Sequence, residues 1–238
     1  MRVSAIMPVY NGAAYLREAL DSVFTQTCPL HEVIVVDDGS TDASPQILAA
    51  YRQRISVLRQ TNQGVAAARN AGLRRASGEA IAFLDQDDLW PADRTRLMVD
   101  ALAADPDAEV VAGLVEIRDE QTVKPGMRDV CLDTTHREYL LGSLCIRTGL
   151  FGKLGLLNEN FGFADDTDFW RRRVEANITT IRLNEPTLVY RVHDNGASSS
   201  RHFANHYLLA AIRESLKRRR SAQTKNSKHE DISHRPPL

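Results

Sequence analysis

Residues 80–88 read AIAFLDQDD, a short apolar run of strand type that ends abruptly in three carboxylates within four residues. Carboxylates this close repel one another, and the usual remedies are a raised pKa, exposure to solvent, or a divalent cation that takes oxygen ligands. A magnesium-type ion is commonly held by one or two carboxylates and completes its shell with water and substrate phosphates. The stretch therefore indicates a buried strand that leads into a site for a nucleotide or a phosphorylated substrate. The alternative is a solvated acidic loop before a helix that begins near WPAD, residues 90–93.

Apolar runs of strand type alternate with helical patterns along the chain, which predicts an α/β fold with a mostly parallel sheet flanked by helices. The expected strands are residues 3–9, 32–36, 55–58, 80–84 and 109–117, and the expected helices are residues 13–26, 64–76 and a helix opened by Ser44-Pro45. Ligands of open α/β sheets bind at the carboxyl ends of the strands. The acidic loops at Asp37 and Asp85 are therefore expected to meet at that edge.

Length and composition favour one domain with a real core, since the chain has 238 residues of which 43% are hydrophobic. The net charge of -1 gives no reason to expect nucleic acid as a partner. No window approaches the roughly 18 apolar residues of a membrane span, and the N-terminus lacks the apolar core of a signal peptide. We therefore expect a cytoplasmic location. Cys28, Cys131 and Cys145 lie far apart and are interpreted as reduced cysteines without zinc or disulfides.

Charge separates the last residues from the rest of the chain. Residues 217–238 carry a balance of +5, which leaves -6 for residues 1–216. We therefore predict a domain over residues 1–216 and a basic, disordered tail over residues 217–238. A helix is expected over residues 200–216, and its apolar face is assigned to core packing, with dimer contact or membrane-surface attachment as alternatives. That face consists of Phe203, Tyr207, Leu208, Ala211, Ile212 and Leu216.

Four motifs follow one another in the first half of the chain, namely PVYN at residues 8–11, VVDDGSTD at 35–42, the helix of residues 66–72 with Arg69-Asn70, and DQD at 85–87. In order and spacing they resemble the motifs of glycosyltransferase family 2, with DQD in the position of the family's DxD motif. The resemblance covers about residues 3–195 and implies a single domain of the GT-A fold, a Rossmann-like α/β architecture. Its donor half is residues 1–105, and its acceptor half is residues 106–216. The total length is short for the family, so acceptor-side elements are reduced or supplied by a partner.

The first two motifs are expected to bind the nucleotide base. Pro8 and Tyr10 are expected to shape and line the base pocket, the alternatives being strand termination and edge packing. The Asp38 carboxylate can accept a hydrogen bond from the imide N–H of uracil or thymine, as the matching residue of the family does, which favours a UDP- or dTDP-sugar. Asp37 and Asp42 have helix and turn capping as the alternative, which we prefer for Asp42.

The next residues are expected to bind the donor diphosphate and a metal ion. Arg69 either approaches the diphosphate or orients a carboxylate, and the alternative is an exposed helical arginine. Asp85 is expected to point at the ribose or the metal, while Asp87 is the predicted direct ligand of Mn²⁺ or Mg²⁺ and Asp88 is its rival. His193 lies in YRVHDN, which resembles a late segment of related enzymes in which a histidine joins the metal. The alternative is a histidine that only forms hydrogen bonds within a loop.

The general base is expected at the start of a helix that contains Asp165 and Asp166. Its apolar residues Phe169, Trp170 and Val174 are predicted to turn inward and to hold the first helical turn against the core. The resemblance implies that Asp166 is the base that deprotonates the acceptor, and that Asp165 stands where the family often has Glu. The alternative is plain capping of the helix N-terminus.

The resemblance implies a metal-dependent, inverting transfer of a sugar from a nucleotide-diphosphate donor to an acceptor hydroxyl. The acceptor is expected to be a glycan or a lipid-linked glycan, with residues 158–162 and 118–142 as the acceptor-facing loops. Residues 200–238 are candidates for peripheral contact with the inner face of the membrane. One alternative is a sugar nucleotidyltransferase, although Asn11-Gly12 is not the Gly-rich basic loop that it needs. The other alternative is a non-catalytic nucleotide-sugar-binding protein of the same fold. The sequence leaves the oligomeric state open.

Overall fold

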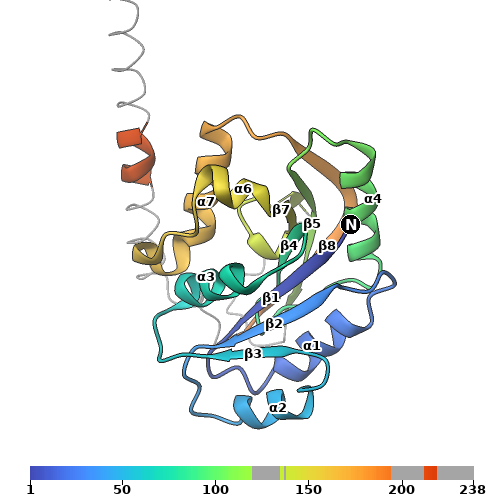
Figure 1. Ribbon diagram of the computed structural model, residues 1–238, viewed down its shortest axis with the longest axis vertical. Helices are drawn as coiled ribbons and strands as arrows, with labels where there is room; N and C mark the ends of the chain where they lie inside the picture. The colour runs from blue at the N-terminus through green and yellow to red at the C-terminus, as the bar shows by residue number, and fades with distance from the viewer. Residues whose placement is uncertain (120–134, 137, 194–211, 219–238) are drawn as a thin grey trace, which may run out of the picture.

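The computed structural model describes residues 1–119, 135–136, 138–193 and 212–218, and within them the chain forms an α/β fold around an eight-stranded sheet (Figure 1). The strand order is β3-β2-β1-β4-β7-β5-β6, and β8 pairs with β5. Four adjacent strands run parallel to one another, namely β1 (Val3–Val9), β2 (Glu32–Asp37), β3 (Ser56–Arg59) and β4 (Ala80–Phe83), and β8 runs parallel to β5. The remaining strands are β5 (Val110–Asp119), β6 (Thr135–His136), β7 (Leu144–Arg147) and β8 (Thr180–Val192). The predicted fold class is confirmed.

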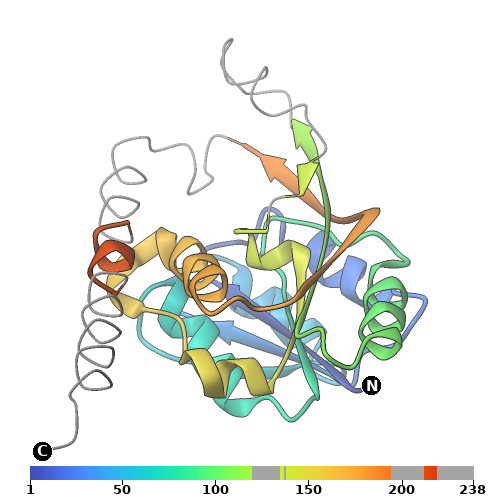
Figure 2. The ribbon, with the colours of Figure 1, turned by 90° about the horizontal axis from the view of Figure 1, so that it is seen from above.

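Helices cover both faces of the sheet (Figures 1 and 2). One face packs against α1 (Leu16–Phe24), α2 (Ser44–Ala50) and α4 (Arg94–Ala104), and the other packs against α3 (Val65–Arg75), α6 (Gly149–Leu154) and α7 (Asp165–Glu175). The short 3-10 helices η1 (Leu141–Ser143) and η2 (Glu159–Ala164) lie in the second half of the chain. Because both faces are covered, the central strands are buried on both sides and appear in the sequence as continuous apolar runs.

The strand order reverses between β1 and β4. From β1 the chain moves outward to β2 and β3, and it then returns to place β4 on the other side of β1. In open α/β sheets, ligands bind outside the carboxyl ends of the strands at such a reversal. The loops that follow β1, β2 and β4 contain residues 10–15, 38–43 and 84–93, and they are the loops that sequence analysis selected.

Several predicted details are wrong. Val174 does not turn inward, because its side chain is 48% exposed. The inward position four residues after the buried Phe169 is taken by Arg173 instead, as the 3.6-residue period of a helix requires. Leu216 is also exposed, and the neighbouring Ser215 is buried in its place.

The limits of the description affect three other predictions. Residues 120–134, 137 and 194–211, which hold Cys131, most of one acceptor-facing loop and most of the expected C-terminal apolar face, lie outside the described residues. The described helical segment 212–218 continues past residue 216, where the domain was expected to end. Within the described part of the chain, no helix combines the length and the apolar character needed to cross a membrane.

Candidate active site

Gln86, the central residue of DQD, joins the loops after β1 and β4. Its Oε1 accepts a hydrogen bond from the backbone N–H of Tyr10 at 2.8 Å, and its Nε2 donates to the Tyr10 carbonyl at 3.0 Å. The approach leaves no room for a side chain at Gly12, where a Cβ would lie 2.2 Å from Gln86 Oε1. No role was predicted for Gln86, since nothing in its residue type indicates its partner. Gln86 thus fixes the two loops that border the strand-order reversal.

The residues expected around the base lie in these loops with different degrees of exposure. The Tyr10 ring is 47% exposed and is accessible as a contact surface, whereas Pro8 is buried within β1. Because β1 continues to Val9, Pro8 does not terminate the strand. The Asp42 carboxylate accepts the backbone N–H groups of Ala13 and Ser44, both at 2.9 Å, which agrees with the preferred capping role.

Asp38 holds the loop that leads into α3. Its carboxylate accepts hydrogen bonds from Gln60 Nε2 at 2.8 Å, from the Gln63 N–H at 2.9 Å and from the Gly64 N–H at 2.8 Å. A carboxylate has about four acceptor positions, so one remains for a base. The imide contact expected for Asp38 therefore stays a prediction, and the bonds to the loop are a second role that sequence analysis did not assign.

Arg69 links two carboxylates that are far apart in the sequence. Its guanidinium donates to both Asp85 oxygens, at 2.6 and 2.9 Å, and to Asp165 Oδ2 at 2.8 Å. Burial alone would lower the pKa of Arg69, but Asp165, Asp85 and Asp166 together raise it, so the group stays charged. Since the side chain is buried, the alternative of an exposed helical arginine is wrong, and the arginine orients carboxylates.

Asp166 and Asp165 differ in environment although they are adjacent. Asp165 is buried against Arg69, whereas Asp166 is partly exposed and accepts the backbone N–H of Thr167 at 2.6 Å. Burial raises the pKa of Asp166 to about 7, with a further contribution from the negative charge of Asp165, while Arg69 opposes the shift. A carboxyl group that titrates near neutral pH is suited to accept a proton from a substrate. Ala164 occupies the N-cap position, so capping does not account for Asp165, whose carboxylate is paired with Arg69.

Asp87 and His193 lie together, as expected of two ligands of one metal ion. The distance from His193 Nε2 to Asp87 Oδ2 is 3.1 Å. Neighbouring ligands in an octahedral shell with bonds of about 2.1 Å lie about 3.0 Å apart, so the pair fits a single divalent ion. The described residues contain no group of three or more such ligands.

Asp88 has a different setting from Asp87. It is buried, and its Oδ1 accepts the backbone N–H of Arg191 at 2.9 Å. Burial, together with the negative charge of Asp87, raises the pKa of Asp88 well above its ordinary value. Burial also raises the pKa of Asp87, with a contribution from Asp85, but the hydrogen bond with His193 opposes that shift. The geometry therefore favours Asp87 over Asp88 as the metal ligand.

Arg191 and Tyr15 support this pair and were not predicted. Arg191 donates to the Asp87 carbonyl and to Glu18 Oε2, and its guanidinium lies 4.7 Å above the ring of Tyr15. The other neighbour of that ring is His193, with 4.3 Å between the ring centres. The segment YRVH was selected because it resembles a late segment of related enzymes. Its contacts with α1 and with the loop after β4 could not be predicted, because they depend on the fold.

The model of Glycosyl transferase family 2 matches residues 4–175. The chain therefore belongs to this family.

Individual relatives agree with this membership. An uncharacterised glycosyltransferase of Rickettsia typhi is 32% identical over 81% of this chain and 64% of its own length. TuaG of Bacillus subtilis, a glycosyltransferase assigned to teichuronic acid biosynthesis, is 29% identical over 84% of this chain and 82% of its own length. The chain spans less than two thirds of the length of several relatives that it matches.

Two solved structures have the same fold and hold ligands. S. aureus TarS 1-349 in complex with UDP gives a TM-score of 0.65 at 26% identity, covering 82% of this chain and 61% of that one. The mannosyltransferase PcManGT from Pyrobaculum calidifontis, in complex with GDP-Man and Mn²⁺, gives a TM-score of 0.68 at 25% identity, covering 91% of this chain and 64% of that one. Both are GT-A structures, which confirms the expected fold.

Proposed function

We propose that this chain is an inverting, metal-dependent glycosyltransferase that moves a sugar from a nucleoside diphosphate donor to an acceptor hydroxyl group. The observation that carries the proposal is Asp166, a partly exposed carboxyl with a pKa of about 7 beside the buried Arg69–Asp165 ion pair. Asp166 takes the proton of the acceptor hydroxyl, and the oxygen attacks the anomeric carbon from the face opposite the nucleotide. The bond from that carbon to the diphosphate breaks, and the nucleoside diphosphate leaves with the electron pair.

The residues at the carboxyl ends of β1, β2 and β4 are proposed to bind the donor. Tyr10 and Asp38 contact the base, which we propose to be uracil or thymine, and the UDP complex of the similar TarS structure supports this choice. The GDP-Man complex of PcManGT shows that donors differ within the fold, so the base is to be tested directly. Asp87 and His193 would hold Mn²⁺ or Mg²⁺, which when bound stabilises the charge that develops on the departing diphosphate.

The acceptor is proposed to be a glycan or a lipid-linked glycan. The assignment of the related TuaG to teichuronic acid biosynthesis supports a glycan acceptor. The η2 turn, which follows Asn158 and contains Gly162 at a φ of 51°, leads directly into α7 and is the proposed acceptor-facing loop among the described residues. A cytoplasmic enzyme with a basic C-terminal segment is suited to acceptors at the inner face of a membrane.

Replacing Asp166 by Asn tests catalysis against mere binding. The amide keeps the size of the side chain but cannot take the proton, so we expect transfer to fall by about 100-fold or more while donor affinity changes little. Transfer is measured by release of nucleoside diphosphate with UDP-, dTDP- and GDP-sugars, and donor affinity by calorimetry. Near-normal transfer by Asp166→Asn would overturn the assignment of the base. The absence of transfer by the wild-type protein with every donor, despite donor binding, would favour a non-catalytic binding protein.

The metal assignment is tested separately with Asp87→Asn. This variant should bind the donor in the presence of Mn²⁺ no better than the wild type does after chelation, because one of the two proposed protein ligands is weakened. Asp88→Asn is the matched comparison and should retain Mn²⁺-dependent donor binding, since Asp88 is buried against Arg191. Full-rate transfer by chelated wild-type protein would show that the reaction needs no metal.

A further inference from the structure

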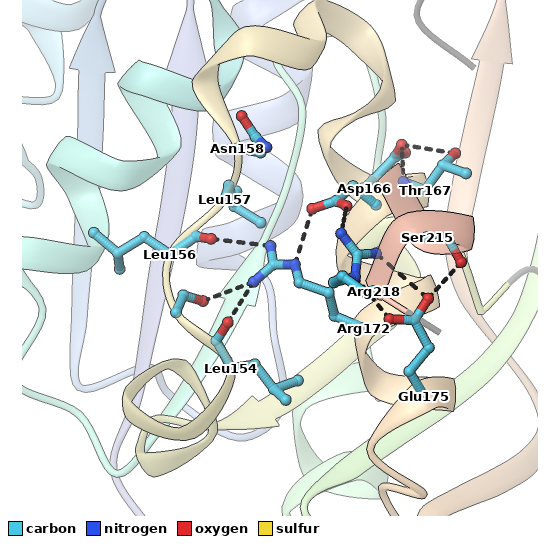
Figure 3. Close-up of polar contacts among 12 residues, drawn as sticks. Leu154, Leu156, Leu157, Asn158, Asp166, Thr167, Arg172, Glu175, Ser215 and Arg218 are labelled. Atoms are coloured by element: carbon cyan, nitrogen blue, oxygen red, sulfur yellow. Dashed lines mark hydrogen bonds and ion pairs between the residues drawn. The ribbon is translucent and has the colours of Figure 1, made fainter. Parts of the chain in front are cut away.

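The described helical segment 212–218 lies against α7 (Figures 1 and 2). Arg218 Nε donates to Glu175 Oε2 at 2.7 Å, and Arg218 Nη1 lies 3.2 Å from Asp168 Oδ1. The Ser215 hydroxyl also donates to Glu175, as Figure 3 shows. The segment therefore binds α7 by polar contacts at the first and the last turn of the helix.

Asp168 is the buried centre of these contacts. Its side chain is only 1% exposed, and each of its oxygens has its own guanidinium partner, Arg218 on Oδ1 and Arg172 on Oδ2, the latter at 2.8 Å. Arg172 in turn donates to the carbonyls of Leu154, at 2.7 Å, and Leu156, at 2.9 Å (Figure 3). Two arginines from different parts of the chain thus compensate one buried carboxylate, which is costly to leave unpaired.

The contacts continue along one face of α7. Asp165, Asp168, Arg172 and Glu175 follow one another at spacings of three or four residues and therefore lie in one row on the helix. Arg69 of α3 holds the first member of the row, and the segment 212–218 holds the second and the last.

Asp166 lies between the two anchored residues of the first turn. Among the described residues, its carboxylate accepts hydrogen bonds from Thr167, the next residue of the same helix. The position of its carboxylate is therefore set by the backbone, which Asp165 and Asp168 fix on either side. Misplacing a reacting group by about 1 Å can cost about 100-fold in rate, so this anchoring bears on catalysis.

We propose that Arg218 is a positioning residue for the reaction, and that it holds the first turn of α7 through Asp168 so that Asp166 meets the acceptor hydroxyl. This inference rests on the proposed function of Asp166. It gives Arg218 a role in the reaction, although this residue lies beyond residue 175, where the match to the family model ends.

A purely structural role of Arg218 would change stability alone, whereas a positioning role also changes the acid limb of the pH–rate profile. The charged groups that face Asp166 are Asp165 on the same helix, Arg69 on α3 and Asp85 after β4. If the first turn loosens, water reaches Asp166 and the effect of burial on its pKa diminishes. The acid limb should then move to lower pH as the rate falls.

The experiment compares Arg218→Met with Lys217→Met in the full chain. Methionine keeps much of the length of the side chain and removes the charge. Within the described part of the chain, the ion-pair partner of Lys217 is Glu214 of its own segment, at 3.2 Å, so its replacement is a matched loss of charge that spares α7. We expect Arg218→Met to lower kcat about tenfold, with the KM for the donor within about twofold and the acid limb at lower pH. Lys217→Met should match the wild type.

Arg218→Lys is the second variant. Lysine retains one charge but cannot bridge Asp168 and Glu175 as a guanidinium does, so we expect kcat between those of the wild type and Arg218→Met. If Arg218→Met does not fold, Arg218→Lys serves as the test in its place. If the folded Arg218 variants keep the wild-type kcat and pH profile, the inference is overturned. It is also overturned if Lys217→Met lowers kcat as much as Arg218→Met does. If Asp166→Asn nevertheless abolishes transfer, the proposed function stands and only the role of Arg218 is rejected.

Discussion

At the scale of single residues, Asp166 combines a cost in stability with a use in catalysis. Burial and the charge of Asp165 raise its pKa from 3.8 to about 7. Between these values the folded state binds more protons than the unfolded state, so the free energy of unfolding falls as the pH rises. The same shift makes the carboxylate a better proton acceptor near neutral pH. A residue of this kind is expected where a site is organised for function rather than for stability.

We therefore predict that Asp166→Asn stabilises the protein near pH 8 and has a much smaller effect near pH 4, where the wild-type carboxyl is protonated in the folded state and only partly ionised in the unfolded state. A gain of about 1 kcal/mol near pH 8 corresponds to about 2–4 °C in Tm for a domain of this size. Thermal unfolding at the two pH values measures the difference. Asp100→Asn, at an exposed position on α4, is the control and should show no such pH-dependent gain. A lower Tm for Asp166→Asn near pH 8 would contradict the assignment of a raised pKa.

The wild-type rate should follow the same titration. Because Asp166 must be deprotonated to act as a base, kcat/KM should rise with pH through a transition near pH 7 and reach a plateau above it. The measurement is a pH–rate profile at saturating metal. A flat profile from pH 5.5 to 8.5 would show that no group of this pKa limits the reaction.

At the scale of secondary-structure elements, the first half of the chain was predictable because β1, β2 and β4 are buried on both faces and form apolar runs in the sequence. Pro45 lies in the first turn of α2, and β4 ends within a residue of its expected limit. The second half was less predictable. The first half of β8 alternates exposed and partly buried residues, and β7 has only four residues, so neither produces a long apolar run.

The site shows the same division between local and long-range information. Asp87 and Asp166 were selected because their motifs are local. Their exact pairings were not predicted, since Arg69 meets Asp165 across 96 positions and Arg191 meets Asp88 across 103. The burial of such a charge depends on which elements the sheet order brings together, and no spacing within a motif encodes it. The error at Val174 has a local cause, because Phe169 and Arg173 share the inward row of α7 and Val174 follows one residue later.

At the scale of the whole molecule, we infer that the functional unit includes the segment 212–218, because Ser215 and Arg218 contact α7. We predict that removal of residues 221–238 leaves Tm and transfer to a water-soluble acceptor unchanged, whereas removal of residues 212–238 lowers both. The longer deletion takes away Arg218 and Ser215 and leaves Asp168 and Glu175 with fewer partners.

The loss from the longer deletion should be about 2 kcal/mol, the scale of a buried acceptor left without its partner, or about 4–8 °C in Tm. Thermal unfolding and nucleotide-release assays of the two truncated proteins make the comparison. Residues 217–238 carry a net positive charge, whereas residues 1–216 carry a net negative charge. We therefore also predict that both deletions weaken binding to anionic vesicles, because each removes positive charge. If the two truncated proteins have the same Tm and the same kcat, the segment 212–218 contributes nothing to α7, and the functional unit ends before it.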